Sequence, residues 1–112
     1  MLALAVNYRA PRRWREKVAS FASALERAFG PRLEAVVALP DPEDRLYDSN
    51  VLVVLSGPVT LEDHSTVARL TPEGISPLVT SGDDRASLEA FLLAGGKEVM
   101  CSRGSGGRAE AE

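Results

Sequence analysis

The sequence predicts an α/β domain, in the broad sense that includes α+β folds, with a mixed sheet of three to five strands and helices packed on it. Residues 11–29 carry apolar side chains at the spacing of one helical face. Residues 33–39 and 50–56 are short apolar runs bounded by turn residues, as strands are. A chain of 112 residues is expected to form one domain, which we place at residues 1–101. Residues 102–112 have no apolar anchor, and we expect them to be disordered.

The first helix has clear start and stop signals. Pro11 suits a first helical turn, and Gly30-Pro31 is a typical stop. The apolar stripe between them predicts a helix packed on a sheet, and its members are Trp14, Val18, Phe21, Ala22, Leu25, Ala28 and Phe29.

The next two elements are predicted to pair as antiparallel strands. Pro40-Asp41-Pro42-Glu43-Asp44 ends the strand at 33–39, and the more apolar strand at 50–56 is expected at the sheet centre. About nine residues separate the two strands, whereas a parallel crossover takes roughly a dozen or more. An antiparallel pair places Leu39-Pro40 beside Asp48–Asn50.

The second half of the chain predicts two helices and two strands. Thr60 and Asp63 resemble the capping pair of a helix that runs to about Leu70. Residues 75–80 indicate a third strand, and Pro77 places it at an edge or a bulge.

The remaining elements are short. Residues 81–84 predict the cap of a last helix, which Gly95-Gly96 closes. Residues 98–101 permit a terminal strand, and the alternation at residues 2–8 permits another.

Composition excludes several classes of function. A net charge of −3 argues against an electrostatic grip on nucleic acid or anionic lipid, so we expect neither as a partner. No apolar run approaches the roughly 20 residues that a membrane span needs. The single Cys101 fits a reducing compartment, and together these features predict a cytoplasmic protein. The absence of Gln is typical of a thermophilic source, although GC-rich coding also favours Arg and Ala.

Isolated reactive side chains are interpreted as structural or surface residues. His64 is predicted at the surface, and Cys101 as a packed or idle thiol. Basic residues gather near the N-terminus, and we interpret them as a solvated helix face, with a phosphate- or acid-binding patch as the alternative: Arg9, Arg12, Arg13, Arg15 and Lys17.

The most informative segment is Asp48-Ser49-Asn50 followed by five apolar residues. Side chains two residues apart share one face of an extended strand, so Asp48 and Asn50 are expected to point the same way. Phosphoryl-transfer and metal-dependent enzymes present acidic ligands at such a strand entry. The second position here is an amide.

This order of elements resembles the minimal nucleotidyltransferases of the DNA polymerase β-type superfamily, and small archaeal members in particular. The resemblance covers residues 11–100. Members of that family carry Gly-Ser after the first strand, then Asp-x-Asp at the next strand, and a third acid on a neighbouring strand. Asp48 matches the first aspartate.

This chain departs from the family pattern at the chemical positions. Leu39-Pro40 stands where the family has Gly-Ser, and proline offers no N–H to a phosphate. Asn50 replaces the second aspartate. Ser76 is the nearest match to the third acid, with Glu73 just before it.

These departures predict a degenerate site without nucleotidyl transfer. Two Mg²⁺ ions about 3.5–4 Å apart need bridging carboxylates to offset their repulsion, and an amide supplies no charge. Asp48 and Asn50 are therefore treated as vestigial catalytic residues and as the candidate metal ligands. Mg²⁺ is expected only if the protein is active.

Three functions remain open from the sequence. The first is a nucleotide- or protein-binding module, with a weakly held nucleotide, a homodimer, or a HEPN-type partner as in toxin–antitoxin modules. The second is an active Mg²⁺-dependent nucleotidyltransferase that combines Asp48 with the acidic-loop carboxylates of Asp41, Glu43 and Asp44. The third is a small structural α/β domain of unrelated ancestry.

Overall fold

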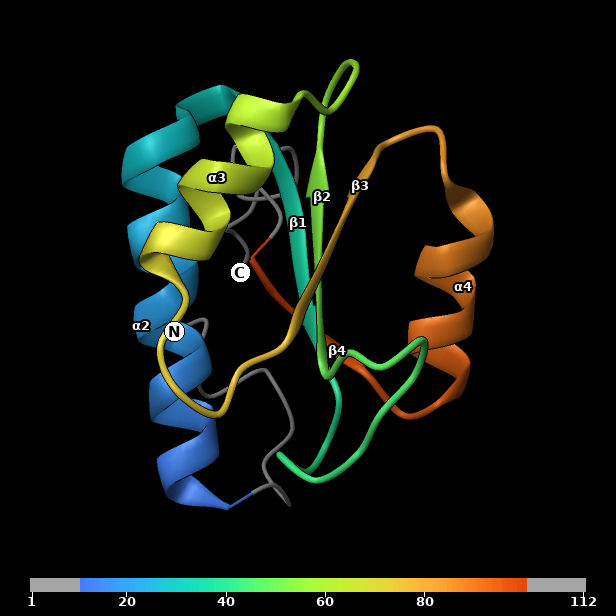
Figure 1. The fold of residues 1–112 in the computed structure, drawn as a ribbon. Helices are drawn as coiled ribbons and strands as arrows, with labels where there is room; N and C mark the ends of the chain where they lie inside the picture. The colour runs from blue at the N-terminus through green and yellow to red at the C-terminus, as the bar shows by residue number, and fades with distance from the viewer. Residues whose placement is uncertain (1–10, 101–112) are drawn as a thin grey trace, which may run out of the picture.

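A four-stranded mixed sheet with helices on both faces forms the domain (Figure 1). The computed structural model describes residues 11–100, so the strand expected at residues 2–8, Cys101 and the tail at residues 102–112 lie outside it. The predicted fold class is confirmed. The elements are α2 (Arg12–Phe29), η1 (Gly30–Arg32), β1 (Leu33–Ala38), β2 (Val51–Leu55), α3 (Leu61–Leu70), β3 (Pro77–Ser81), α4 (Arg85–Leu93) and β4 (Lys97–Met100).

The strands are ordered β3-β2-β1-β4 across the sheet. Strand β1 is antiparallel to both β2 and β4, and β2 is parallel to β3. The predicted antiparallel pairing is confirmed, with Ala38 opposite Val51 at the hairpin end. The connection from β2 to β3 passes through α3, because a parallel pair needs a crossover of that length.

Helices cover the two faces of the sheet unequally. Figure 1 shows α2 and α3 on one face and α4 on the other. The cluster beneath α2 and α3 is the larger and contains Trp14, Val18, Phe21, Ala22, Leu25, Leu33, Val36, Ala38, Val51, Val53, Leu55, Val67, Ile75 and Val99. The cluster beneath α4 contains Ala35, Val37, Leu39, Leu52, Val54 and Phe91. All five residues of β2 are buried because the strand is interior and covered on both sides, as expected for the sheet centre.

The predicted helix signals account for the helix ends. The apolar stripe of α2 is buried from Trp14 to Leu25, whereas Ala28 is exposed and Phe29 half-buried. Helix α3 begins with a complete capping box between Thr60 and Asp63. Within residues 11–100, no helix is long and apolar enough to cross a membrane.

Candidate functional site

Leu39 and Asn50 meet at the hairpin end of β1 and β2, as the sequence predicted. The Leu39 N–H donates to the Asn50 carbonyl at 3.0 Å. The Leu39 carbonyl accepts a bond of 2.8 Å from the indole Nε1–H of Trp14. Leu39 is 1% exposed, so the position that the resemblance aligns with Gly-Ser holds a buried side chain. Both of its backbone groups are already bonded within the domain.

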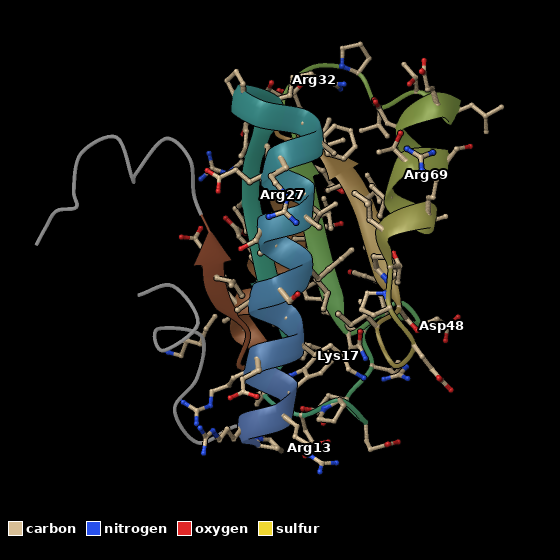
Figure 2. The ribbon with its side chains drawn as sticks, turned by 90° about the vertical axis from the view of Figure 1, so that its left-hand side faces the viewer. Arg13, Lys17, Arg27, Arg32, Asp48 and Arg69 are labelled. Carbon is tan, nitrogen blue, oxygen red and sulfur yellow. The ribbon has the colours of Figure 1, made fainter. Side chains whose placement is uncertain are left out.

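Asp48 lies in a tight turn that precedes β2. Leu46 and Ser49 exchange backbone hydrogen bonds of 2.8 and 2.9 Å, and the two residues between them, Tyr47 and Asp48, have φ of 55° and 63°. These are the left-handed values of a two-residue type I′ turn. The prediction that Asp48 and Asn50 share a strand face is therefore wrong, because it assumed an extended backbone from 48 to 50. Figure 2 shows Asp48 at the periphery, and its side chain is exposed.

Asn50 is fully buried, and its carboxamide joins three segments of the chain. Its Nδ2 donates to the Pro42 carbonyl and to the Gly74 carbonyl, each at 3.0 Å. Its Oδ1 accepts from the Ser76 N–H at 2.9 Å. We call this arrangement the Asn50 joint: it ties the start of β2 to the loop that follows β1 and to the loop that precedes β3.

The chemistry of the Asn50 joint depends on an amide. Only an amide of this size donates two hydrogen bonds and accepts a third from the same side chain. An ionised aspartate would keep the bond from Ser76 but would point a negative oxygen at the carbonyls of Pro42 and Gly74. A buried charge with the Ser76 N–H as its one donor and two carbonyls facing it is strongly unfavourable. The carboxamide of Asn50 is thus used structurally, and its role as a metal ligand stays a prediction.

Ser76 and Glu73, the nearest matches to the third acid of the family pattern, contribute backbone groups to the hydrogen bonds of this region. Ser76 contributes its N–H to Asn50, and its carbonyl accepts from the Asn50 N–H at 3.0 Å. The carbonyl of Glu73 accepts from Nζ of Lys17 at 2.7 Å. The carboxylate of Glu73 is exposed. Lys17 and Asn50 together anchor the loop before β3 to α2 and β2.

The acidic loop after β1 is held by turn hydrogen bonds. Oδ1 of Asp41 accepts from the N–H of Glu43 at 2.8 Å. Nη1 of Arg45 donates to the carbonyls of Pro42 and Asp44 at 2.6 and 2.9 Å. In the described part of the chain, no group of three or more His, Cys, Asp or Glu side chains is placed to hold a metal ion. The carboxylates of this loop and Asp48 are not brought together into such a group.

A hollow of about 520 Å³ opens between α3 and β3. Val67, Ile75, Pro77 and Val79 supply apolar surface, and His64 and Glu73 contribute polar side chains. His64 is exposed, which confirms the prediction of a surface residue. Asp48 and Asn50 do not line this hollow.

Sequence reasoning missed an ion pair at the opposite end of the sheet. The guanidinium of Arg32 donates to both carboxylate oxygens of Asp63, at 3.0 and 2.9 Å. These hydrogen bonds, followed by the bond from the Thr60 N–H, hold the pKa of Asp63 well below its usual range. The same carboxylate raises the pKa of Arg32. The capping box was visible as Thr60 and Asp63, but nothing in the local sequence points to a partner 31 residues away.

No family model, no curated protein and no solved structure matches this chain significantly.

Proposed function

We propose that this protein is a nucleotidyltransferase-like binding module in which the catalytic edge has become the Asn50 joint. Its work is to hold a protein partner or, weakly, a nucleotide, without transferring a nucleotidyl group. A HEPN-type protein is the heterologous partner that the resemblance implies. The bonding of Asn50 carries the proposal, because a residue bonded to two carbonyls and one N–H has no charge and little free coordination capacity for Mg²⁺.

The order of elements also supports this proposal. Helix α2, strand β1, the acidic loop, strand β2 and then strand β3 follow one another in the order on which the resemblance rests. The antiparallel pairing of residues 33–38 with 51–55 also supports this proposal over the unrelated structural domain.

Nucleotide binding and transfer are tested on the full chain with labelled ATP. We expect no transfer product with or without Mg²⁺. We also expect the thermal midpoint with ATP to be the same whether or not Mg²⁺ is present, because ligand stabilisation follows the occupancy of a real site. Asp48→Ala should behave like the unmodified protein in both measurements.

A matched control separates catalysis from charge effects. Asp44→Ala removes another exposed carboxylate from the same loop. Mg²⁺-dependent transfer that disappears in Asp48→Ala and persists in Asp44→Ala would show an active enzyme and overturn the proposal. Partner binding is tested by a search for a HEPN-type protein in the genes beside this one and by co-expression of the two chains. Co-elution at a fixed stoichiometry supports the heterologous version.

A further inference from the structure

The outer edge of β3 carries backbone groups that no described strand uses. β3 is the last strand on its side of the sheet (Figure 1), and all five of its residues are half-buried. On its inner side it pairs with β2 in regular parallel register, with Val53 opposite Val79. An edge of this kind is a template for pairing with another strand.

The hydrogen bonds to β2 show which groups face outward. The Asn50 N–H donates to the Ser76 carbonyl, and the Gly82 N–H donates to the Leu55 carbonyl at 2.9 Å. Backbone groups alternate in direction along a strand, so the even-numbered residues face β2 and the odd-numbered residues face out. The outward residues of β3 are Pro77, Val79 and Ser81.

These outward groups are complementary to a second copy of themselves. Val79 presents both its N–H and its carbonyl, Ser81 presents its N–H, and Pro77 presents a carbonyl but has no N–H. The Ser81 carbonyl already accepts from the Asp84 N–H at 3.0 Å. In an antiparallel pair centred on Val79, Pro77 of one copy lies opposite Ser81 of the other. Pro77, which has no N–H to donate, then lies opposite the Ser81 carbonyl of the other copy. That carbonyl needs no donor from Pro77, because it already accepts from the Asp84 N–H.

We propose that two copies of this chain form a dimer through antiparallel β3 strands related by a two-fold axis at Val79. The Val79 residues exchange two backbone hydrogen bonds, and each Ser81 N–H donates to the Pro77 carbonyl of the other copy. The two sheets become one continuous sheet. Edge prolines usually discourage pairing, whereas Pro77 here selects the register.

The side chains beside this edge favour the same pairing. Val79 packs against the larger hydrophobic cluster, and Pro77 and Val79 both line the hollow beside α3. Residues opposite each other in an antiparallel pair place their side chains on the same face. Val79 of the second copy therefore lies next to Val79 of the first, beside the hollow that both Pro77 and Val79 line. This inference does not depend on the resemblance to nucleotidyltransferases.

The oligomeric state is measured by analytical ultracentrifugation of the full chain over a range of concentrations. We expect a monomer–dimer equilibrium. Val79→Pro removes an N–H that makes no hydrogen bond within residues 11–100, so the circular dichroism spectrum should persist while dimerisation weakens at least about tenfold. Leu93→Lys removes an 88% exposed apolar side chain elsewhere and should leave the dimer unchanged.

Disulfide trapping in a Cys101→Ser background tests the register directly. Facing residues in a hydrogen-bonded antiparallel pair have Cα atoms about 5.5 Å apart, within disulfide range, so Val79→Cys should cross-link between copies. Ser81→Cys is the matched control, because the two copies of residue 81 are offset by four positions, roughly 14 Å. A monomer at every concentration overturns the proposal, as does cross-linking through residue 81 in preference to residue 79. If Val79→Pro fails to fold, the trapping result alone decides.

Discussion

Replacing Asn50 with Asp tests the Asn50 joint with the smallest possible change of shape. The two side chains have nearly the same volume, so packing is preserved. The variant removes two N–H donors and places a carboxylate against the carbonyls of Pro42 and Gly74, which both lie 3.0 Å from Nδ2 in the native protein. It also supplies the second aspartate of the family pattern that the chain resembles.

The expected loss of stability is large. The Gly74 carbonyl loses the donor from Asn50, which costs roughly 1–3 kcal/mol, whereas the Pro42 carbonyl keeps its bond of 2.6 Å from Nη1 of Arg45. An uncompensated buried charge typically costs about 3–5 kcal/mol. We therefore expect the free energy of unfolding of Asn50→Asp to fall by about 3–5 kcal/mol at pH 7.5. That is a considerable share of the roughly 5–15 kcal/mol typical of a domain.

The pH dependence identifies the cause. Burial and the two facing carbonyls should raise the pKa of the new carboxyl above its unfolded value of about 3.9. The penalty is then complete above the folded pKa and shrinks as the pH falls through it toward the unfolded pKa, because the protonated acid is uncharged and donates one hydrogen bond. Asn50→Ala loses both hydrogen bonds from Nδ2 and also the bond from the Ser76 N–H, but it gains no charge, so its penalty should not change over this range.

The assay is urea unfolding followed by far-ultraviolet circular dichroism at pH 7.5 and 4.5 for the native protein and both variants. An Asn50→Asp protein as stable as the native one at pH 7.5 would refute the reasoning. So would a recovery of its stability on addition of Mg²⁺, which would mean that the position is a metal site blocked only by the amide.

Three further variants test other contacts. Trp14→Phe leaves the carbonyl bonded by the indole without its donor and should lower the free energy of unfolding by about 1–3 kcal/mol in urea, whereas an unchanged midpoint would contradict the importance of that bond. Asp63→Asn neutralises the ion pair with Arg32. Because the folded pKa of Asp63 lies below its unfolded value, the native protein should be the more stable above about pH 4, and the gap should close as the pH falls further, as followed by thermal unfolding. Tyr47→Asn combined with Asp48→Gly supplies the residues that a type I′ turn prefers and should raise the unfolding free energy by about 1 kcal/mol; a loss would place the left-handed φ values in doubt.

The antiparallel pairing of the first two strands could be predicted because the length of the connecting loop limits how two strands can pair. The connection expected between the first two strands is shorter than a parallel crossover of roughly a dozen or more residues, although the observed strands are shorter and leave residues 39–50 between them. A proline at the start of β3 is compatible with an edge. Thr60 and Asp63 predicted the start of α3 because both partners of a capping box lie within one helical turn of the sequence. These features depend only on local chemistry or on loop length.

The details of the candidate site could not be predicted for two physical reasons. The left-handed turn at Tyr47 and Asp48 lacks the Asn-Gly pair that usually marks it, so an extended backbone was assumed instead. The partners of Asn50 are carbonyls and an N–H of loops whose positions depend on the packing of α2 and α3. From sequence alone, an asparagine before an apolar strand fits a metal ligand as well as a side chain that hydrogen-bonds to backbone groups. Only the positions of those loops distinguish the two roles.

The unequal covering of the sheet has a consequence for motion within the folded state. Helix α4 contributes Phe91 as its buried residue, whereas α2 contributes Trp14, Val18, Phe21, Ala22 and Leu25. Segments with little buried apolar surface open locally at low free energy, so amide protons of α4 should exchange with solvent sooner than those of α2. β4 follows α4 in the chain and lies at the far edge from β3. The domain can therefore loosen at its C-terminal edge while the β3 edge keeps its shape.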